Sequence, residues 1–525
     1  MKNRGKPTPR NALFGCMAGG WSLTALTALL LLTVFQRRTN YVCRVDFLLP
    51  NFLLLLAGGL GLILCSYVYL RNRDTVDHFA QRHAEKEIRI LSAAVFFLQA
   101  YLFFNIYFLS GWDVEVVVTV AENIAEGNPL FWHNYFSRYP NNLGITWVLT
   151  LLFRINNALG NAAEPVYFVI LVQCAASCMA GYLLFQVVKD MTGAASGFGA
   201  WLVYILHVAF SPWLTIPYTD AMTLLIPISV LRLYQTAKAG THPVVKWAAI
   251  GFLSAFGYKL KPQCAIILIA IVICEGVGFF GKNAHLASRL KQLGILLTGA
   301  AAALTLLGGI LLPSLGYEVD KEQTLGPSHF LMMGLNWDTC GVYSDDDVSY
   351  SLSIPTASER FTANLQTAKN RVQSLGVAGL VKHLARKCLV NFGDGTYAWG
   401  MEGGFYTSVP PVKNQRMSPL LREIFYSTGA YYPYFAVFQQ FVWITILLSS
   451  AGMALYFVTN RENAEVTCVI ALALLGLVMF QTIFEARARY FFSYSPLFIC
   501  AAFLGWTGFI RFLRSRVMRA GKKRG

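Results

Sequence analysis

Long apolar runs recur along this chain of 525 residues and limit what it can fold into. Many contain about 18 or more residues, the length at which a helix crosses roughly 30 Å of hydrocarbon. The composition agrees, because 55% of the residues are hydrophobic and only 13% are charged. The sequence therefore predicts an all-α polytopic membrane protein.

We predict about twelve transmembrane helices from the length and the flanks of each run. Lys and Arg lie mainly in short connections, such as the predicted loop 71–89, and in the C-terminal tail; together they give a net charge of +16. Cytoplasmic loops have this bias, so we place both termini in the cytoplasm. The predicted helices are residues 12–35, 47–70, 91–110, 165–188, 194–211, 219–236, 246–258, 263–281, 292–313, 431–457, 465–483 and 489–511.

One apolar stretch, residues 143–155, is left out of this count. As a helix it is only about 20 Å long, and counting it would export the basic C-terminal tail. We expect it to lie on the outer surface, within an exported loop at 110–164. A second interpretation exchanges it for residues 246–258, which are equally short, but this would export Lys238 and Lys246.

These helices and loops divide the chain into four regions. Within the third we predict a helix from about 359 to 374. Long exported loops are usually functional or disordered, and this one is rich in aromatic and polar residues. The regions are an N-terminal helix pair with a basic loop (1–90), a transmembrane core with the first exported loop (91–313), an extracytoplasmic region (314–430) and C-terminal helices with a basic tail (431–525).

Two carboxylates lie where the third predicted helix emerges, in GWDVEVVVTV. A single carboxylate there would often mark only the membrane interface. Asp113 and Glu115 together, beside Trp112, indicate more, because a partly desolvated carboxylate holds a proton more readily and suits a general base. They are the catalytic candidates.

Basic residues occupy two other predicted exported turns, GYKLKPQ and FEARARYFFSYSP. Lys259 and Lys261 lie in the first turn, Arg487 and Arg489 in the second. Lysines at such a position can simply extend to the interface. Lys and Arg also bind phosphate, Arg in a bidentate manner. We therefore predict an anionic phosphate group near these turns.

Metal ligands are not indicated. The 11 cysteines include no CxxC pair, and His329, His383 and Glu402 lack the spacing of a metal site. Asp345 to Asp347 lack the glycine and glutamate of a calcium loop, which favours a solvated turn or a helix cap. We expect no metal site and no disulfide framework.

Six blocks of the sequence, in order, resemble blocks of membrane glycosyltransferases of Gram-positive bacteria. With the polytopic plan, they make the chain similar to the GT-C superfamily of integral membrane glycosyltransferases and to its protein O-mannosyltransferase-like enzymes. The resemblance covers roughly residues 90 to 500. The blocks are YFSRYPNNLG, SPWLTIPYTD, GYKLKPQ, PSHFLMMGLN, NFGDGTYAWGMEGGF and EARARYFF.

The resemblance implies transfer of one sugar from a polyprenyl-phosphate donor to an extracytoplasmic acceptor, without a cofactor or a required divalent metal. It makes Asp113 the base and puts Lys259, Lys261, Arg487 and Arg489 near the donor phosphate. Many relatives have a second acidic residue beside the first, whereas this chain has Val114 and then Glu115. The residues expected around the sugar and the acceptor are Arg138, Tyr139, Asn141, Asn142, Tyr218, Asp220, His329, Asn336, Asp394 and Glu402.

Three other functions stay open. A lipid-linked sugar flippase or transporter would use ionisable residues within its spans, and these are scarce here, with His207 the main candidate. An oligosaccharide ligase or polymerase on a related fold would use a larger donor. A membrane scaffold would not need polar residues gathered on one face. The acceptor class also stays open between a cell-envelope polymer, which analogy favours, a glycolipid and a protein. We expect the chain in a bacterial plasma membrane.

Overall fold

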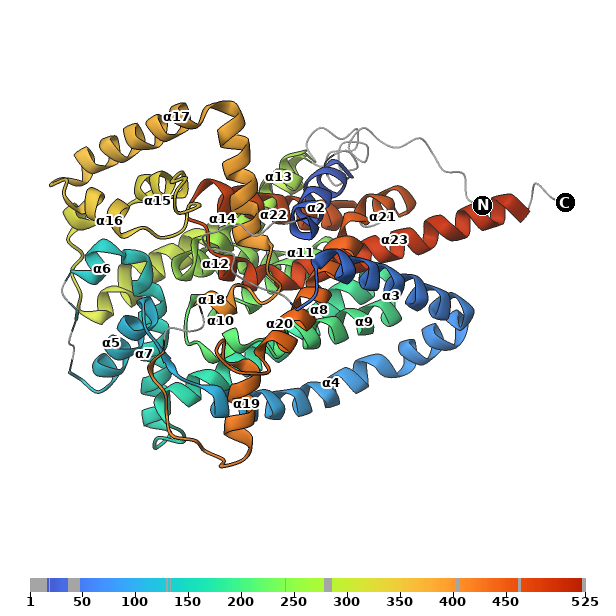
Figure 1. The fold of residues 1–525 in the computed structure, drawn as a ribbon, viewed down its shortest axis with the longest axis horizontal. Coiled ribbons are helices and arrows are strands. Elements are labelled where there is room, and N and C mark those ends of the chain that lie inside the picture. The colour runs from blue at the N-terminus through green and yellow to red at the C-terminus, as the bar shows by residue number, and fades with distance from the viewer. Residues whose placement is uncertain are drawn as a thin grey trace.

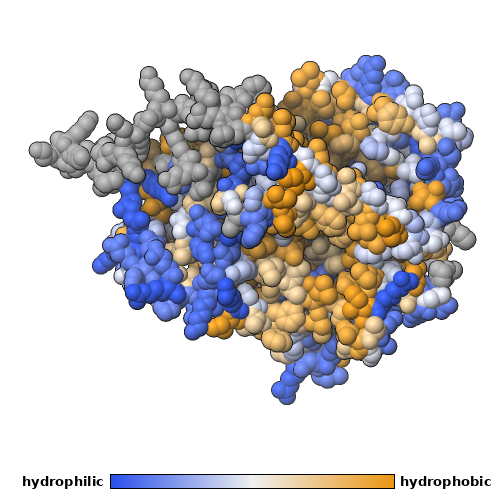
Figure 2. All heavy atoms as spheres, turned by 180° about the vertical axis from the view of Figure 1, so that it is seen from behind, coloured by the Kyte–Doolittle hydropathy of each residue, from blue (hydrophilic) through white to orange (hydrophobic). Residues whose placement is uncertain are grey.

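The computed structural model describes residues 17, 19–35, 48–128, 131–132, 134–240, 242–277, 286–402, 406–460 and 464–521, which are mostly helical. Long helices run side by side through the molecule, and shorter helices gather at one end (Figure 1). Hydrophobic residues form a band across the middle of the face seen in Figure 2, with hydrophilic residues concentrated on either side. A band of this kind is the surface that lipid covers in a membrane protein.

Among the described residues, seven helical segments are long and apolar enough to cross a bilayer. Three shorter apolar segments accompany them, at Gly19–Val34, Ala194–Ala209 and Pro262–Val277. The seven are α3 (Asn51–Arg71), α4 (Arg73–Ile106), α8 (Pro165–Thr192), α14 (Leu286–Leu306) with its extension to Leu315, α20 (Tyr432–Ala451) with α21 (Met453–Thr459) as far as Val458, α22 (Ala464–Ile483), and η10 (Ala488–Tyr494) with α23 (Ser495–Gly521) as far as Arg514.

The prediction of twelve spans is therefore not confirmed. The predicted span 219–236 is broken into α10 (Thr219–Met222) and α11 (Leu225–Lys238). The predicted span 246–258 is α12 (Pro243–Leu260), and 143–155 belongs to α7 (Leu143–Ala158). Neither α7 nor α12 is as apolar as the seven long segments and the three shorter ones. Length and composition therefore do not decide which of these two helices crosses the membrane.

The prediction that residues 71–89 form a basic loop is wrong, because most of this segment is helical. Residues from Arg73 onward form the first half of α4, a single helix of 34 residues. At about 1.5 Å per residue it extends well beyond a bilayer core, so its charged half can be helical outside the lipid. There Glu85 accepts from Lys189 of α8 at 2.8 Å, which packs this half of α4 against the bundle.

Close helix packing depends on glycine between α12 and α14. A methyl group at Gly251 would collide with the carbonyl oxygen of Leu296, and one at Gly299 with that of Ala248. Small residues of this kind let membrane helices approach closely, where lipid provides no hydrophobic driving force. The contact fixes α12, whose C-terminal end carries Lys259 and Lys261.

Four charged side chains cluster where α11 ends and where α14 and α22 begin. Glu275 of α13 (Ala265–Val277) is fully buried and pairs with Arg289 and, at 2.9 Å, with Lys238. Both cations also contact Glu465, at 3.2 Å from Arg289 and 2.9 Å from Lys238. Two carboxylates thus balance two cations, which a charge cluster inside a membrane protein requires.

A helical lobe follows α14. It comprises α15 (Pro327–Gly334), α16 (Asp345–Leu352) and α17 (Ala357–Phe392), which is kinked at Gly376 with φ 59°. The helix predicted at about 359–374 is confirmed as the first part of α17. The three consecutive aspartates form the first turn of α16, where Ser344 accepts from the Asp347 amide.

Candidate active site

The candidate site lies where three long helices end. α4 ends at Ile106, α12 at Leu260 and α22 at Ile483, and each is followed by a short irregular segment. We call this the site end of the bundle. A short antiparallel pair, β1 (Leu109–Ser110) with β2 (Tyr406–Ser408), holds the segment that follows α4. The topology thus brings separate turns of the chain to one place.

Asp113 is the first residue of α5 (Asp113–Ala125) and is half-buried. Tyr135 donates to its Oδ1 at 2.5 Å, and Tyr218 donates to its Oδ2 at 3.1 Å. Asn142 links the two tyrosines, because it donates to the Tyr135 hydroxyl at 2.6 Å and accepts from Tyr218 at 2.9 Å. Both carboxylate oxygens of Asp113 are therefore held in a defined orientation.

The hydroxyl groups of Tyr135 and Tyr218 stay neutral at ordinary pH. Burial raises the pKa of both hydroxyls well above the usual value of 10, and the charge of Asp113 adds to the shift. A neutral hydroxyl donates a hydrogen bond to a carboxylate without adding charge to the site.

The Tyr135 hydroxyl gives a first prediction. Tyr135→Phe should lower the turnover rate of the proposed transfer by about tenfold, because one hydrogen bond to a charged group contributes roughly 1.5 kcal/mol. Steady-state rates with a labelled donor test this. An unchanged rate would remove Tyr135 from the site.

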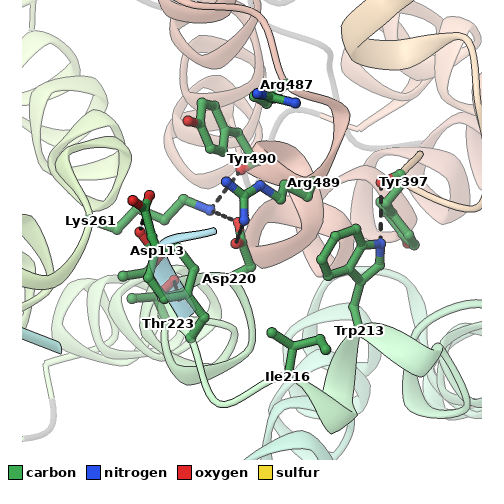
Figure 3. A network of polar contacts seen from close by, with 12 residues as sticks. Asp113, Trp213, Ile216, Asp220, Thr223, Lys261, Tyr397, Arg487, Arg489 and Tyr490 are labelled. Carbon is green, nitrogen blue, oxygen red and sulfur yellow. Dashed lines mark hydrogen bonds and ion pairs between the residues drawn. The ribbon is translucent and has the colours of Figure 1, made fainter. Parts of the chain in front are cut away.

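A buried charge cluster lies beside Asp113 (Figure 3). Asp220, at the start of α10, is 2% exposed and accepts from Lys261, which is 3% exposed. Arg489 of η10 (Ala488–Tyr494), 6% exposed, has its Nη1 atom 3.7 Å from the second oxygen of Asp220. One carboxylate thus faces two cations, and this group of three side chains carries a net positive charge.

Aromatic rings connect this cluster to Asp113. The guanidinium carbon of Arg489 lies 3.8 Å from the ring centroid of Trp112 and 5.5 Å from that of Tyr218. Tyr218 contacts Asp113 directly, and Trp112 is its neighbour in the chain. Only one layer of side chains therefore separates the carboxylate from the Arg489 guanidinium, and Lys261 meets Arg489 at Asp220. Such contacts hold a guanidinium without neutralising it.

The backbone at Trp112 supports this arrangement. Trp112 precedes α5 with φ 56° and ψ −151°, a conformation that residues other than glycine rarely adopt. Its indole nitrogen is buried without a hydrogen-bond partner among the described residues. Local strain of this kind persists where the surrounding structure holds it, often at functional sites.

Arg487 lies next to this cluster and contacts other groups. Its Nε is 3.3 Å from Glu485, and the Tyr490 hydroxyl donates to the same carboxylate at 3.4 Å. Partial burial raises the pKa of Glu485, and the charges of Arg487 and Arg489 offset part of that shift. Arg487 is thus the second cation of this segment, at the margin of the cluster.

Several predicted site residues are not brought to the cluster, and three of them lie close to it in the sequence or in the fold. Glu115 accepts from Thr407 at 3.3 Å, on another side of α5. Lys259 is half-buried, and its backbone packs against Gly144 of α7. Asn141 is exposed and contacts only its neighbour Asn142 among the contacts of the described residues. Residues close in the sequence thus have side chains that point in different directions. Lys261 points into the cluster and Lys259 does not, and Asp113 points toward the cluster whereas Glu115 does not.

The polar residues predicted for the sugar and acceptor pocket lie in several places. Arg138 and Tyr139 are half-buried beside Tyr135, whose ring centroid is 5.4 Å from that of Tyr139. Asp220, expected near the sugar, instead pairs with the two cations. Away from the cluster, His329 contacts Ser351, Asn336 contacts Asp347, and Asp394 accepts from Thr396; the side chain of Glu402 lies outside the described residues.

Sequence reasoning missed two contributors. Tyr135 lies in a quoted block, but nothing in the block distinguishes it from the other aromatic residues there. Tyr490 places its ring 5.2 Å from the Lys261 amine, and its carbonyl oxygen lies 3.4 Å from the same atom. Both roles depend on contacts between distant segments, so no local pattern indicates them.

Lys387 ties α17 to the segment that carries the cations. It is fully buried, and its amine donates to the carbonyl oxygens of Gly334, at 2.7 Å, and Phe484, at 2.5 Å. Burial lowers its pKa to about 7, although the charge of Glu485 acts in the opposite direction.

This pKa predicts how stability depends on pH. Between about pH 7 and pH 10 the unfolded chain holds a proton on Lys387 that the folded chain has lost, so stability should rise with pH across this window. Lys387→Met should flatten the rise, and Lys369→Met, an exposed change on the same helix, should leave it intact. Thermal unfolding in detergent across pH measures this. An identical pH dependence in both variants would contradict the prediction.

Comparisons with known proteins give one family and two distant structural likenesses. No curated protein matches the chain. The oligosaccharyltransferase AglB from Archaeoglobus fulgidus, solved with an inhibitory peptide and a dolichol-phosphate, is 10% identical with a TM-score of 0.39 over 83% of this chain. The chain spans only 52% of that protein's length. ArnT from Cupriavidus metallidurans, bound to undecaprenyl phosphate, is 11% identical with a TM-score of 0.31, over 80% of this chain and 76% of its own.

Scores of this size do not establish a common fold. The family match is much broader, because a family described as a conserved hypothetical integral membrane protein matches residues 24–509. This range includes every helix that contributes to the candidate site. The chain therefore belongs to this family of integral membrane proteins.

Proposed function

We propose that the chain is a membrane glycosyltransferase that moves a single sugar from a polyprenyl-phosphate donor to an extracytoplasmic acceptor. One observation carries the proposal: the carboxylate of Asp113 lies one aromatic layer away from two buried cations, Lys261 and Arg489. A base and an anion site at this separation suit a reaction that deprotonates a hydroxyl and releases a phosphate.

The reaction is a displacement with inversion. Asp113 accepts the proton of the acceptor hydroxyl while the acceptor oxygen forms a bond to the anomeric carbon. The bond from that carbon to the donor phosphate oxygen breaks, and its electron pair stays on the phosphate. Lys261 and Arg489 stabilise the charge that develops there, which is where we expect most of the rate gain. No cofactor or metal enters this scheme.

The ion pair with Asp220 prepares the cations for the donor. Lys261 and Arg489 both face this buried carboxylate, so a phosphate that binds beside it would meet two cations that are already oriented. Arg487, at the margin of the cluster, completes the anion site. Arg138 and Tyr139 lie on the Asp113 side and are the proposed contacts of the acceptor.

The acceptor side follows from charge. The basic connections and the basic C-terminal tail favour the cytoplasm, and this supports a position of Asp113 and its partners on the outer face of a bacterial plasma membrane. The acceptor there is a cell-envelope polymer, a glycolipid or a protein hydroxyl.

A transfer assay tests the proposal. The purified chain, in nanodiscs, would be given polyprenyl phosphate carrying one radiolabelled sugar, together with membrane extract as acceptor. We expect label in a new glycosidic product and release of polyprenyl phosphate. Transfer only from donors that carry several sugars would favour a ligase or polymerase. Movement of the labelled lipid across vesicles without a new glycosidic bond would favour a flippase.

A further inference from the structure

The helix α17 has an unusual distribution of charge. From Arg360 to Gly393 the sequence contains six Arg and Lys residues and no Asp or Glu. Four of these cations are engaged within the lobe. Lys369 and Lys382 are exposed, and the Lys382 amine lies 5.7 Å from the centroid of the Trp337 ring. A helix without acidic residues is suited to an anionic surface.

The kink at Gly376 exposes apolar side chains next to this charge. Val377 is 84% exposed and Val381 62% exposed, on the turns that follow the kink. Positions four residues apart lie on the same face of a helix. Lys382 follows directly in the sequence and is also exposed. We call residues 375–382 the elbow of α17.

The position of the elbow relative to the spans can be fixed from contacts. The Lys387 amine bonds the carbonyl oxygen of Phe484, and Asn391 donates to that of Gln481 at 3.0 Å, so this part of α17 lies level with the end of α22. Figure 1 shows the second part of α17 running steeply across the direction of the long helices α4 and α23. The elbow, about 15 Å from Lys387 along the helix, therefore stays near that level.

We propose that the elbow of α17 inserts into the surface of the bilayer on the site end of the bundle and binds anionic phospholipid there. An amphipathic helix in this orientation buries its apolar face at the boundary between headgroups and acyl chains, while its cations face the headgroups. Val377 and Val381 would enter the lipid, and Lys382 would contact phosphate groups. The helix that carries Lys387 would thereby connect the lipid surface to the segment of Arg489.

Spin-label accessibility tests the position of the elbow without any measurement of activity. In a full-length variant without native cysteines, a nitroxide would be attached to Val377→Cys or, as the control, to Asn370→Cys, which is exposed before the kink. Both would be reconstituted in vesicles of phosphatidylcholine with phosphatidylglycerol. Collision rates with oxygen report lipid exposure, and those with a water-soluble nickel complex report water exposure.

We expect the label at 377 to collide several times more often with oxygen than with nickel, and the label at 370 to show the reverse. Lys382→Glu should reduce the oxygen preference at 377 in these vesicles, and much less in vesicles of phosphatidylcholine alone. A label at 377 with the water exposure of the label at 370 would overturn the proposal. So would an immobilised label that neither reagent reaches, which would mean that another protein surface covers the elbow.

Discussion

Asp113→Asn is expected to abolish transfer almost completely while the protein still folds and binds its donor. A positioned general base contributes about 10²- to 10⁴-fold to a rate, and asparagine cannot accept the proton of the acceptor hydroxyl. Asparagine keeps the size of the side chain and can still accept a hydrogen bond from Tyr218 or Tyr135. The cations pair with Asp220 rather than with Asp113, so donor binding should persist.

The matched control is Glu115→Gln, two residues further along α5. Glu115 contacts Thr407 and lies away from the cations, so this variant should transfer sugar at nearly the normal rate. Turnover with a labelled donor, measured beside donor binding to the same preparation, separates a loss of chemistry from a loss of affinity. Normal turnover by Asp113→Asn would remove Asp113 from the mechanism, and loss of turnover only in Glu115→Gln would transfer the role of base to Glu115.

The fold could be predicted from the sequence where one physical signal dominates. Each of the seven helical segments that are long and apolar enough to cross a bilayer overlaps a predicted span, although the predicted count of twelve is not confirmed. The helix expected near 359–374 is the start of α17. The predicted helix ends were wrong where a helix does not begin or end at the boundary of the lipid. The charged first half of α4 is helical although it lies outside the lipid. At 219–236 a turn at Thr223 divides one expected span into two helices. Hydropathy measures burial in lipid and does not report where helical hydrogen bonds begin.

The sequence could predict which turns of the chain form the site, but it could not predict which side chains contact each other there. Asp113, Lys261 and Arg489 each follow the end of a long helix, so their nearness at one end of the bundle is accessible from topology. Which side chain of a pair faces inward depends on the phase of the last helical turn. The partner of Lys261 is Asp220, 41 residues away, and no sequence pattern indicates that pair. The family resemblance to GT-C enzymes stays a prediction.

Lys261→Met is expected to weaken donor binding by at least tenfold, whereas Lys259→Met should bind the donor almost normally. The two lysines are separated by one residue in GYKLKPQ, and their side chains have different surroundings. Lys261 is buried between Asp220 and the Tyr490 ring, while Lys259 is half-buried outside this cluster. A cation in a buried place interacts with a phosphate far more strongly than one near water. Titration with a short-chain polyprenyl phosphate measures both affinities.

Removal of Lys261 alone also leaves the buried Asp220 with a weaker counter-charge, and breaking a buried pair can cost about 3–5 kcal/mol of stability. The double variant Lys261→Met with Asp220→Asn removes both charges of the pair and should recover most of the thermal stability. It should not recover donor affinity, because the missing cation is what the phosphate binds. If the double variant bound the donor normally, Lys261 would act only by neutralising Asp220. If Lys259→Met and Lys261→Met lost the same donor affinity, the buried position of Lys261 would not explain its role in donor binding.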